Sequence, residues 1–182
     1  DYLVNFIPVA LGRNITTYQR MNVNGIATLP LGYQHPNMYI SKPYIDYQNV
    51  AISLAESNFT IKSIDDLSGK SIAAFQNAKK FIGNAFGKKV SYLLDYREVA
   101  DQMKQISMLY SRRTEVIVLD YRIFKYFLRE NADQPRYKKP INIHYIFDEN
   151  SYSAGFNSKD KCEKFDLGIA RIREQGIYQK IL

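Results

Sequence analysis

The sequence predicts an α/β protein in which a mostly parallel sheet lies between layers of helices. Its 182 residues are 46% hydrophobic, and a chain of this length buries about 70% of its unfolded surface, enough for a core without metal or disulfide support. Apolar and β-branched segments alternate along the chain with helical patterns, which is typical of α/β folds. No internal repeat or low-complexity segment indicates another architecture.

The individual elements follow from local patterns. Helices are predicted over 99–110 and 165–176, where apolar residues recur at spacings of three and four. Strands are predicted where short apolar runs are bounded by turn residues. These runs are 2–7, 50–55, 71–75, 90–94, 115–119 and 141–147.

The composition excludes several kinds of chemistry. One cysteine, Cys162, cannot form an intramolecular disulfide, and His35 and His144 do not give the spacing of a zinc site. We therefore expect no metal and no cofactor. The sequence has no run of about 18 apolar residues that would span a membrane. It also lacks a nucleophile elbow, a Gly-rich phosphate loop and an H-E-x-x-H motif, so we expect no enzyme activity.

The net charge of +7 is distributed unevenly. Residues 59–145 hold 16 basic and 9 acidic residues, whereas both ends of the chain are balanced. The middle is therefore predicted to be a unit distinct from the two ends. The basic residues come in separated pairs, such as 79–80 and 88–89, which favours solvated surface over a nucleic-acid interface. We expect no nucleic-acid partner.

A turn at Gln76 and Asn77 follows the predicted strand 71–75 and precedes a helical pattern. Free backbone N–H groups at such a turn favour an anion, and the charges of Lys79 and Lys80 would add to this preference. An ordinary connection, with Asn77 in a left-handed conformation, explains the same residues. Both interpretations stay open.

Asp120 ends the predicted strand 115–119. Ligands of open α/β sheets gather beyond the carboxyl ends of strands, where an acid accepts hydrogen bonds from an amine or hydroxyl. Asp is also a preferred helix N-cap. One Asp can serve both purposes.

Four segments, taken in order, resemble the family 3 extracellular solute-binding proteins, the periplasmic amino-acid-binding type. Residues 40–44, Ile-Ser-Lys-Pro-Tyr, resemble its Phe-Ser-x-Pro-Tyr element, and residues 61–73 resemble the segment that leads into its second lobe. Residues 109–120 are similar to its strand that ends in Asp, and residues 176–182 to its closing segment.

The resemblance implies a two-lobed periplasmic-binding-protein-like fold with a hinge of two crossing strands and a first lobe that is incomplete at the N-terminus. The first lobe would comprise residues 1–55 and 151–182, and the second 56–150. The implied function is that of a periplasmic or extracytoplasmic domain that captures a small polar solute in the interlobe cleft by hinge closure. The solute would be an amino acid, an amine or a related compound, taken up for transport or sensing with a permease of an ABC transporter or a sensor protein as partner.

The resemblance also implies ligand-binding residues in both lobes. Asp120 matches the acid that binds the ligand's α-amino group. Gln34 stands where the family has an arginine that clamps the α-carboxylate, and the turn 77–79 replaces a Gly-Thr-Thr turn that binds the same carboxylate. The carboxylate half of the site is therefore altered, which leaves a solute without an α-carboxylate as an alternative. The full set of expected ligand contacts is Thr28, Gln34, Asn77, Ala78, Lys79, Asp120 and Tyr152.

Two other functions stay open beside solute capture. A degenerate site would make the chain a sensory or partner-binding module of a membrane signalling protein. Some relatives with this fold are dehydratases, and such an enzyme needs a general acid or base, for which His35 and Glu115 are the candidates. Solute binding is the leading hypothesis because a buried Asp120 without a partner would be costly.

Overall fold

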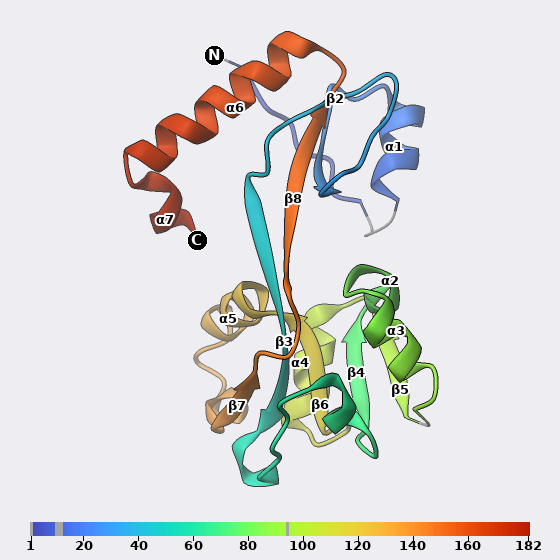
Figure 1. Ribbon diagram of the computed structural model, residues 1–182. Coiled ribbons are helices and arrows are strands. Elements are labelled where there is room, and N and C mark those ends of the chain that lie inside the picture. The colour runs from blue at the N-terminus through green and yellow to red at the C-terminus, as the bar shows by residue number, and fades with distance from the viewer. Residues whose placement is uncertain (1, 10–12, 94) are drawn as a thin grey trace. The chain divides into compact units, whose positions relative to one another are not determined.

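A computed structural model describes residues 2–9, 13–93 and 95–182 (Figure 1). The chain folds as two compact units, Asp1–Asp46 with Ser151–Leu182, and Tyr47–Asn150. The sequence placed the first boundary after residue 55, whereas residues 47–55 lie in the second unit. The reason is that strand β3 (Ile45–Leu54) pairs with the strands of that unit over most of its length.

A mixed sheet with the strand order β7-β3-β6-β4-β5 forms the centre of the second unit. Strand β4 runs parallel to β5 and β6, and β3 runs antiparallel to β6 and β7. The remaining elements have these bounds: β4 Ile72–Phe75, β5 Tyr96–Val99, β6 Val116–Asp120, β7 Ile141–His144, α2 Ala78–Phe81, α3 Asn84–Val90, α4 Gln102–Tyr110, α5 Tyr121–Glu130, and 3₁₀ turns at Ala55–Ser57, Ile64–Leu67 and Pro135–Lys138.

Hydrophobic residues cover both faces of this sheet. Val116 and Val118 of β6 belong to one cluster, together with Phe86 of α3. Ile117 and Leu119 belong to a second cluster with residues of α4 and α5. Because successive residues of a strand point to opposite faces, helices cover the sheet on both sides, as in an α/β fold.

Gln105 of α4 is a buried polar residue that joins two strands. Its side chain is fully buried, and Nε2 donates hydrogen bonds to the carbonyl oxygens of Ala73 in β4 and Val118 in β6, both at 2.8 Å. These bonds fix α4 against two neighbouring parallel strands and satisfy both Nε2 donors, whereas the buried Oε1 has no hydrogen-bond partner among the described residues.

Strand β8 (Glu149–Phe156) is central to the first unit. Strands β1 (Gly25–Pro30) and β2 (Tyr39–Ile40) pair antiparallel with the same residues of β8 and therefore flank it on two sides. A Cβ at Gly155 would lie 2.3 Å from Met38 Sδ and 2.7 Å from Leu29 Cδ1, so the buried side chains of Met38 and Leu29 would have to move to admit one. The helices of this unit are α1 Asn14–Met21, α6 Lys159–Glu174 and α7 Ile177–Ile181.

Most predicted elements have counterparts in the structure, and two predicted strands are wrong. The predictions at 50–55, 71–75, 115–119 and 141–147 correspond to β3, β4, β6 and β7, and the two predicted helices correspond to α4 and α6.

The first wrong strand is 2–7, where the structure has no regular element. Its apolar side chains are exposed, Leu3 by 92%, and they lack the pairing and burial that hold a strand. The second is 90–94. Val90 instead ends α3, where its side chain belongs to the buried face with Phe86 four residues earlier. Residues 91–93 form turns, and Leu94 lies outside the described residues.

Candidate functional site

The carboxyl ends of three parallel strands meet at one edge of the sheet in the second unit. In register, Ala74 of β4 lies between Glu98 of β5 and Val118 of β6. Asp120 follows Val118 by two residues, and Asn77 follows Ala74 by three, so both lie at this edge with Glu98. Ligands of α/β folds bind beyond the carboxyl ends of strands, and this edge is therefore the candidate site.

Asp120 ends β6 and caps α5. Its Oδ1 accepts hydrogen bonds from the backbone N–H groups of Arg122 at 2.9 Å and Ile123 at 3.0 Å. The other carboxylate oxygen, Oδ2, is buried and has no hydrogen-bond partner in the described part of the chain, and the residue as a whole is only 4% exposed. The capping role suggested by the sequence is thus present, and one buried oxygen is left to accept from a donor.

Burial raises the pKa of the Asp120 carboxyl above its ordinary value, because the charged form loses its water. Interactions with the backbone N–H groups of Ile123, Arg122 and Gln48 lower this pKa in part. Burial also raises the pKa of the Tyr47 phenol, and the Asp120 charge raises it further. Tyr47 therefore lies near the carboxylate and adds an aromatic ring to this edge.

The turn after β4 has the left-handed residue that the sequence suggested. Asn77 has φ 64°, a conformation that Asn tolerates better than most residues. Ala78 is buried and begins α2, whereas Lys79 is exposed. The Lys79 ammonium lies 4.9 Å from the centre of the Tyr96 ring, within cation–π distance.

Glu98 of β5, a residue that sequence reasoning missed, binds the backbone donors of this turn. Its Oε2 accepts from the N–H of Asn77 at 2.7 Å, and its Oε1 accepts from the N–H of Lys79 at 3.1 Å. The Tyr96 hydroxyl donates to Oε1 at 3.0 Å. The N–H groups that the sequence suggested for an anion are therefore engaged by a carboxylate of the chain itself.

The other expected ligand contacts lie in the first unit. Thr28 has φ 59° at an irregularity of the β1–β8 ladder, and its hydroxyl donates to Ala27 O at 2.7 Å. Tyr152 of β8 pairs with Pro30, two residues from Thr28, so these contacts share one end of that ladder. Gln34 is exposed in the loop between β1 and β2.

The two candidate acid–base residues have structural partners. The His35 Nδ1 accepts from the N–H of Asn37 at 3.2 Å, and its Nε2 lies 3.3 Å from Gln19 Nε2. Glu115 lies at the amino-terminal end of β6 and accepts from the N–H of Ser71 at 2.8 Å. The first belongs to one unit and the second to the other.

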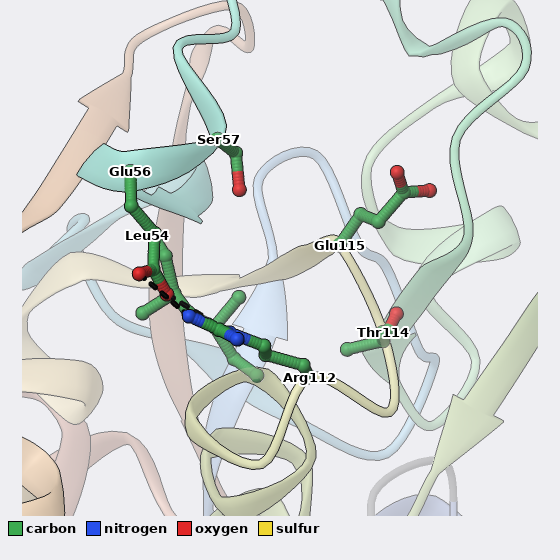
Figure 2. Close-up of a pocket in the computed structure, with 7 residues that line it drawn as sticks. Leu54, Glu56, Ser57, Arg112, Thr114 and Glu115 are labelled. Atoms are coloured by element: carbon green, nitrogen blue, oxygen red, sulfur yellow. Dashed lines mark hydrogen bonds and ion pairs between the residues drawn. The ribbon is translucent and has the colours of Figure 1, made fainter.

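A hollow of about 310 Å³ lies at the amino-terminal end of β6, away from the candidate edge. Figure 2 shows Arg112 reaching Glu56 within it, while the Glu115 carboxylate points away from that pair. The guanidinium donates to Glu56 from Nε at 3.0 Å and from Nη2 at 2.7 Å, so the two charges neutralise each other. We therefore keep the carboxyl edge as the candidate site. The hollow is lined by Leu54, Glu56, Ser57, Leu109, Arg112, Thr114 and Glu115.

Two further findings concern membranes and metals. None of the described helices is both long and apolar enough to cross a bilayer. Within residues 2–9, 13–93 and 95–182, no three His, Cys, Asp or Glu side chains lie together in a way that could hold a metal ion.

Comparison with known proteins identifies the fold. No protein-family model and no curated protein matches the sequence. Solved structures match over almost the whole chain. A mutant of the arginine-binding protein from T. maritima has a TM-score of 0.70 at 17% identity, over 95% of this chain and 73% of that one. An amino-acid ABC transporter substrate-binding protein from Streptococcus pneumoniae, bound to L-arginine, has a TM-score of 0.69 at 18% identity, over 96% and 72%.

A third match is an ancestral amino-acid-binding protein that is a precursor of cyclohexadienyl dehydratase. It has a TM-score of 0.70 at 14% identity and covers 97% of this chain and 74% of that one. The proteins in all three structures bind solutes, and one of them is related to an enzyme. The chain therefore has the two-lobed periplasmic-binding-protein fold, and the resemblance found in its sequence is confirmed at the level of fold.

Proposed function

We propose that the chain is a solute-binding domain that captures a small polar solute without a chemical reaction. The observation that carries the proposal is the buried Oδ2 of Asp120, which has no hydrogen-bond partner among the described residues and lies at the carboxyl edge of β6. A buried carboxylate oxygen without a donor costs free energy. A protonated amine or a hydroxyl group of a solute would supply the missing donor.

The fold supports this proposal. Proteins with the same fold include ABC transporter substrate-binding proteins from Streptococcus pneumoniae, bound to L-arginine in one structure and to histidine in another. By analogy we place this chain outside the cytoplasm, with a membrane permease or a sensor protein as its partner. Thr28, Gln34 and Tyr152 of the first unit are proposed as further solute contacts.

A thermal-shift screen of the intact chain tests the proposal. The panel contains amino acids, primary amines, polyamines and small polar solutes. We expect one chemical class to raise Tm, because a ligand that binds only the folded state at 100 times its Kd adds about 2.7 kcal/mol of stability. For a chain of this length that is a shift of roughly 5–10 °C. A panel in which no compound shifts Tm would contradict the proposal and favour a partner-binding module.

A further inference from the structure

We propose that Glu98 fills the anion-binding turn of the second unit from within and so restricts the solute to amines that lack an α-carboxylate. This inference rests on the proposed function, since it names the class of solute that Asp120 would hold.

The Glu98 carboxylate is held in the way that a bound anion would be. Both oxygens accept backbone N–H groups of the turn, at 2.7 Å from Asn77 and 3.1 Å from Lys79. The Tyr96 hydroxyl adds a donor at 3.0 Å. Burial raises the pKa of the Tyr96 phenol, as does its hydrogen bond to the neighbouring carboxylate, so Tyr96 stays protonated and keeps donating.

The position of this turn explains the effect on selectivity. Val118 and Glu98 lie opposite Ala74 on the two strands that flank β4, so their backbones are roughly 10 Å apart, and Asp120 lies two residues beyond Val118. In an α-amino acid, one carbon atom separates the amine from the carboxylate. An amine bound at Asp120 Oδ2 would therefore leave the carboxylate near the turn, where Glu98 already occupies the donors.

The charges at the turn act in the same direction. A second carboxylate at the Asn77–Lys79 donors would have to displace Glu98 or stand beside a like charge, and both are unfavourable. The Lys79 ammonium lies over the ring of Tyr96, whose hydroxyl donates to Glu98. Lys79 thus belongs to the group of side chains around the internal carboxylate.

Two arginines of this unit are engaged as well. The Arg97 guanidinium forms an ion pair with Asp95. The positive charge of Arg122 acts on Asp120, whose pKa it lowers. Asp120 Oδ2 is therefore a buried carboxylate oxygen that a solute could bind. The N–H groups of the turn are bonded to Glu98, and the Arg97 charge is paired with Asp95. That balance favours a cation.

The test compares amino acids with the amines formed by removing their carboxylate. The pairs are L-arginine with agmatine, L-ornithine with putrescine, and L-histidine with histamine, each titrated by calorimetry into the intact wild-type chain and the Glu98→Ala variant. We expect wild type to bind at least one amine at least ~10-fold more tightly than its amino acid. In Glu98→Ala the two turn donors are released, and the ratio should fall to within ~3-fold through a gain in amino-acid affinity.

Asp66→Ala is the matched control. Asp66 is an acid of the same unit whose Oδ2 also accepts two backbone N–H groups, from Lys62 and Ser63 at 2.9 Å, but it lies in the 3₁₀ turn Ile64–Leu67, before the amino-terminal end of β4. We expect this control variant to keep the wild-type ratio of amine affinity to amino-acid affinity. If Glu98→Ala does not fold, Glu98→Gln replaces it, since the amide can accept only one of the two N–H groups and should lower the ratio at least ~3-fold.

The outcomes separate the two proposals. Wild type that binds an amino acid as tightly as its amine overturns the role of Glu98 and leaves solute capture standing. If the ratio of amine affinity to amino-acid affinity is unchanged in the Glu98 variants, the role of Glu98 is likewise overturned and solute capture still stands. Wild type that binds neither member of any pair overturns this inference, and if the wider solute panel also fails, the proposed function falls with it.

Discussion

The Asp120→Asn variant is expected to bind the cationic solute at least ~100-fold more weakly than wild type, while remaining folded. The substitution removes one charge of a buried charge pair between Asp120 and the solute, and a loss of binding affinity of this size is typical of such a change. Folding should be preserved because Asn is a good N-cap and can keep the bonds from Arg122 and Ile123 at the start of α5. Calorimetric titration and thermal unfolding measure the two effects on the same samples.

The effect of this variant on stability has a definite sign. Burial raises the folded pKa of Asp120 above its unfolded value. Its contribution to stability is therefore complete below the unfolded pKa and is lost as pH rises through the folded pKa. At pH 7 the Asn variant should be at least as stable as wild type.

Asp101→Asn is the matched control for Asp120→Asn. Asp101 caps α4 in the same way, with Oδ1 accepting from the N–H of Lys104 at 3.0 Å, but its side chain is exposed. We expect its solute affinity to stay within ~2-fold of wild type. Equal loss of binding in both variants would contradict a specific role for Asp120, and so would full retention in both.

The Gln105→Glu variant is expected to lose about 3–5 kcal/mol of unfolding free energy at pH 7. The substitution keeps the shape of the side chain but places an oxygen against the carbonyl oxygens of Ala73 and Val118, which now receive hydrogen bonds of 2.8 Å. The introduced carboxyl must be buried charged or take up a proton. Its folded pKa is then raised above the unfolded value of about 4.3, so the part of the penalty that comes from the charge is absent below that pH and grows as pH rises, while the cost of the one hydrogen bond that a protonated carboxyl cannot donate remains at every pH.

Urea unfolding at pH 4 and pH 7 measures this dependence. Gln105→Met removes the two hydrogen bonds without adding a charge and should cost about 1–3 kcal/mol at both values of pH. Gln179→Glu makes the same chemical change at an exposed position of α7 and should change stability by less than about 0.5 kcal/mol. A loss in Gln105→Glu that is the same at both pH values would contradict the account.

The positions of most strands in the second unit's sheet were predictable from the sequence, whereas the predicted mostly parallel order is wrong, since β3 pairs antiparallel with both β6 and β7. Strands β4 and β6 are short β-branched or small apolar runs between turns, and both are fully buried, so local pattern and tertiary environment agree. Strand β5 was missed because Tyr96–Val99 is an edge strand with half-exposed and exposed side chains, which carries a weak apolar signal. The segment 2–7 shows the opposite error. Its apolar residues predicted a strand, but apolar residues alone do not supply a neighbouring strand to pair with.

The candidate site was predictable in part. Asp120 stood out because an acid that directly follows a buried strand is conspicuous, and both roles that the sequence suggested for it suit its two oxygens. Glu98 had no such signal, because the strand of that region was expected at 90–94. Once β5 is placed at Tyr96–Val99, its parallel pairing with β4 brings Glu98 beside Ala74 and within reach of the Asn77 turn. The error in one strand thus concealed the residue that engages the turn.

The most direct test of solute capture at Asp120 is its pKa, measured by ¹³C NMR of the side-chain carboxyl with and without the best compound from the solute panel. In the free protein we expect a pKa above the ordinary value of about 3.9, as burial dictates. A bound cation favours the ionised carboxylate, so saturating solute should lower the pKa, and affinity should weaken as pH falls through the free-state pKa. An Asp120 pKa that saturating solute leaves unchanged would contradict the account.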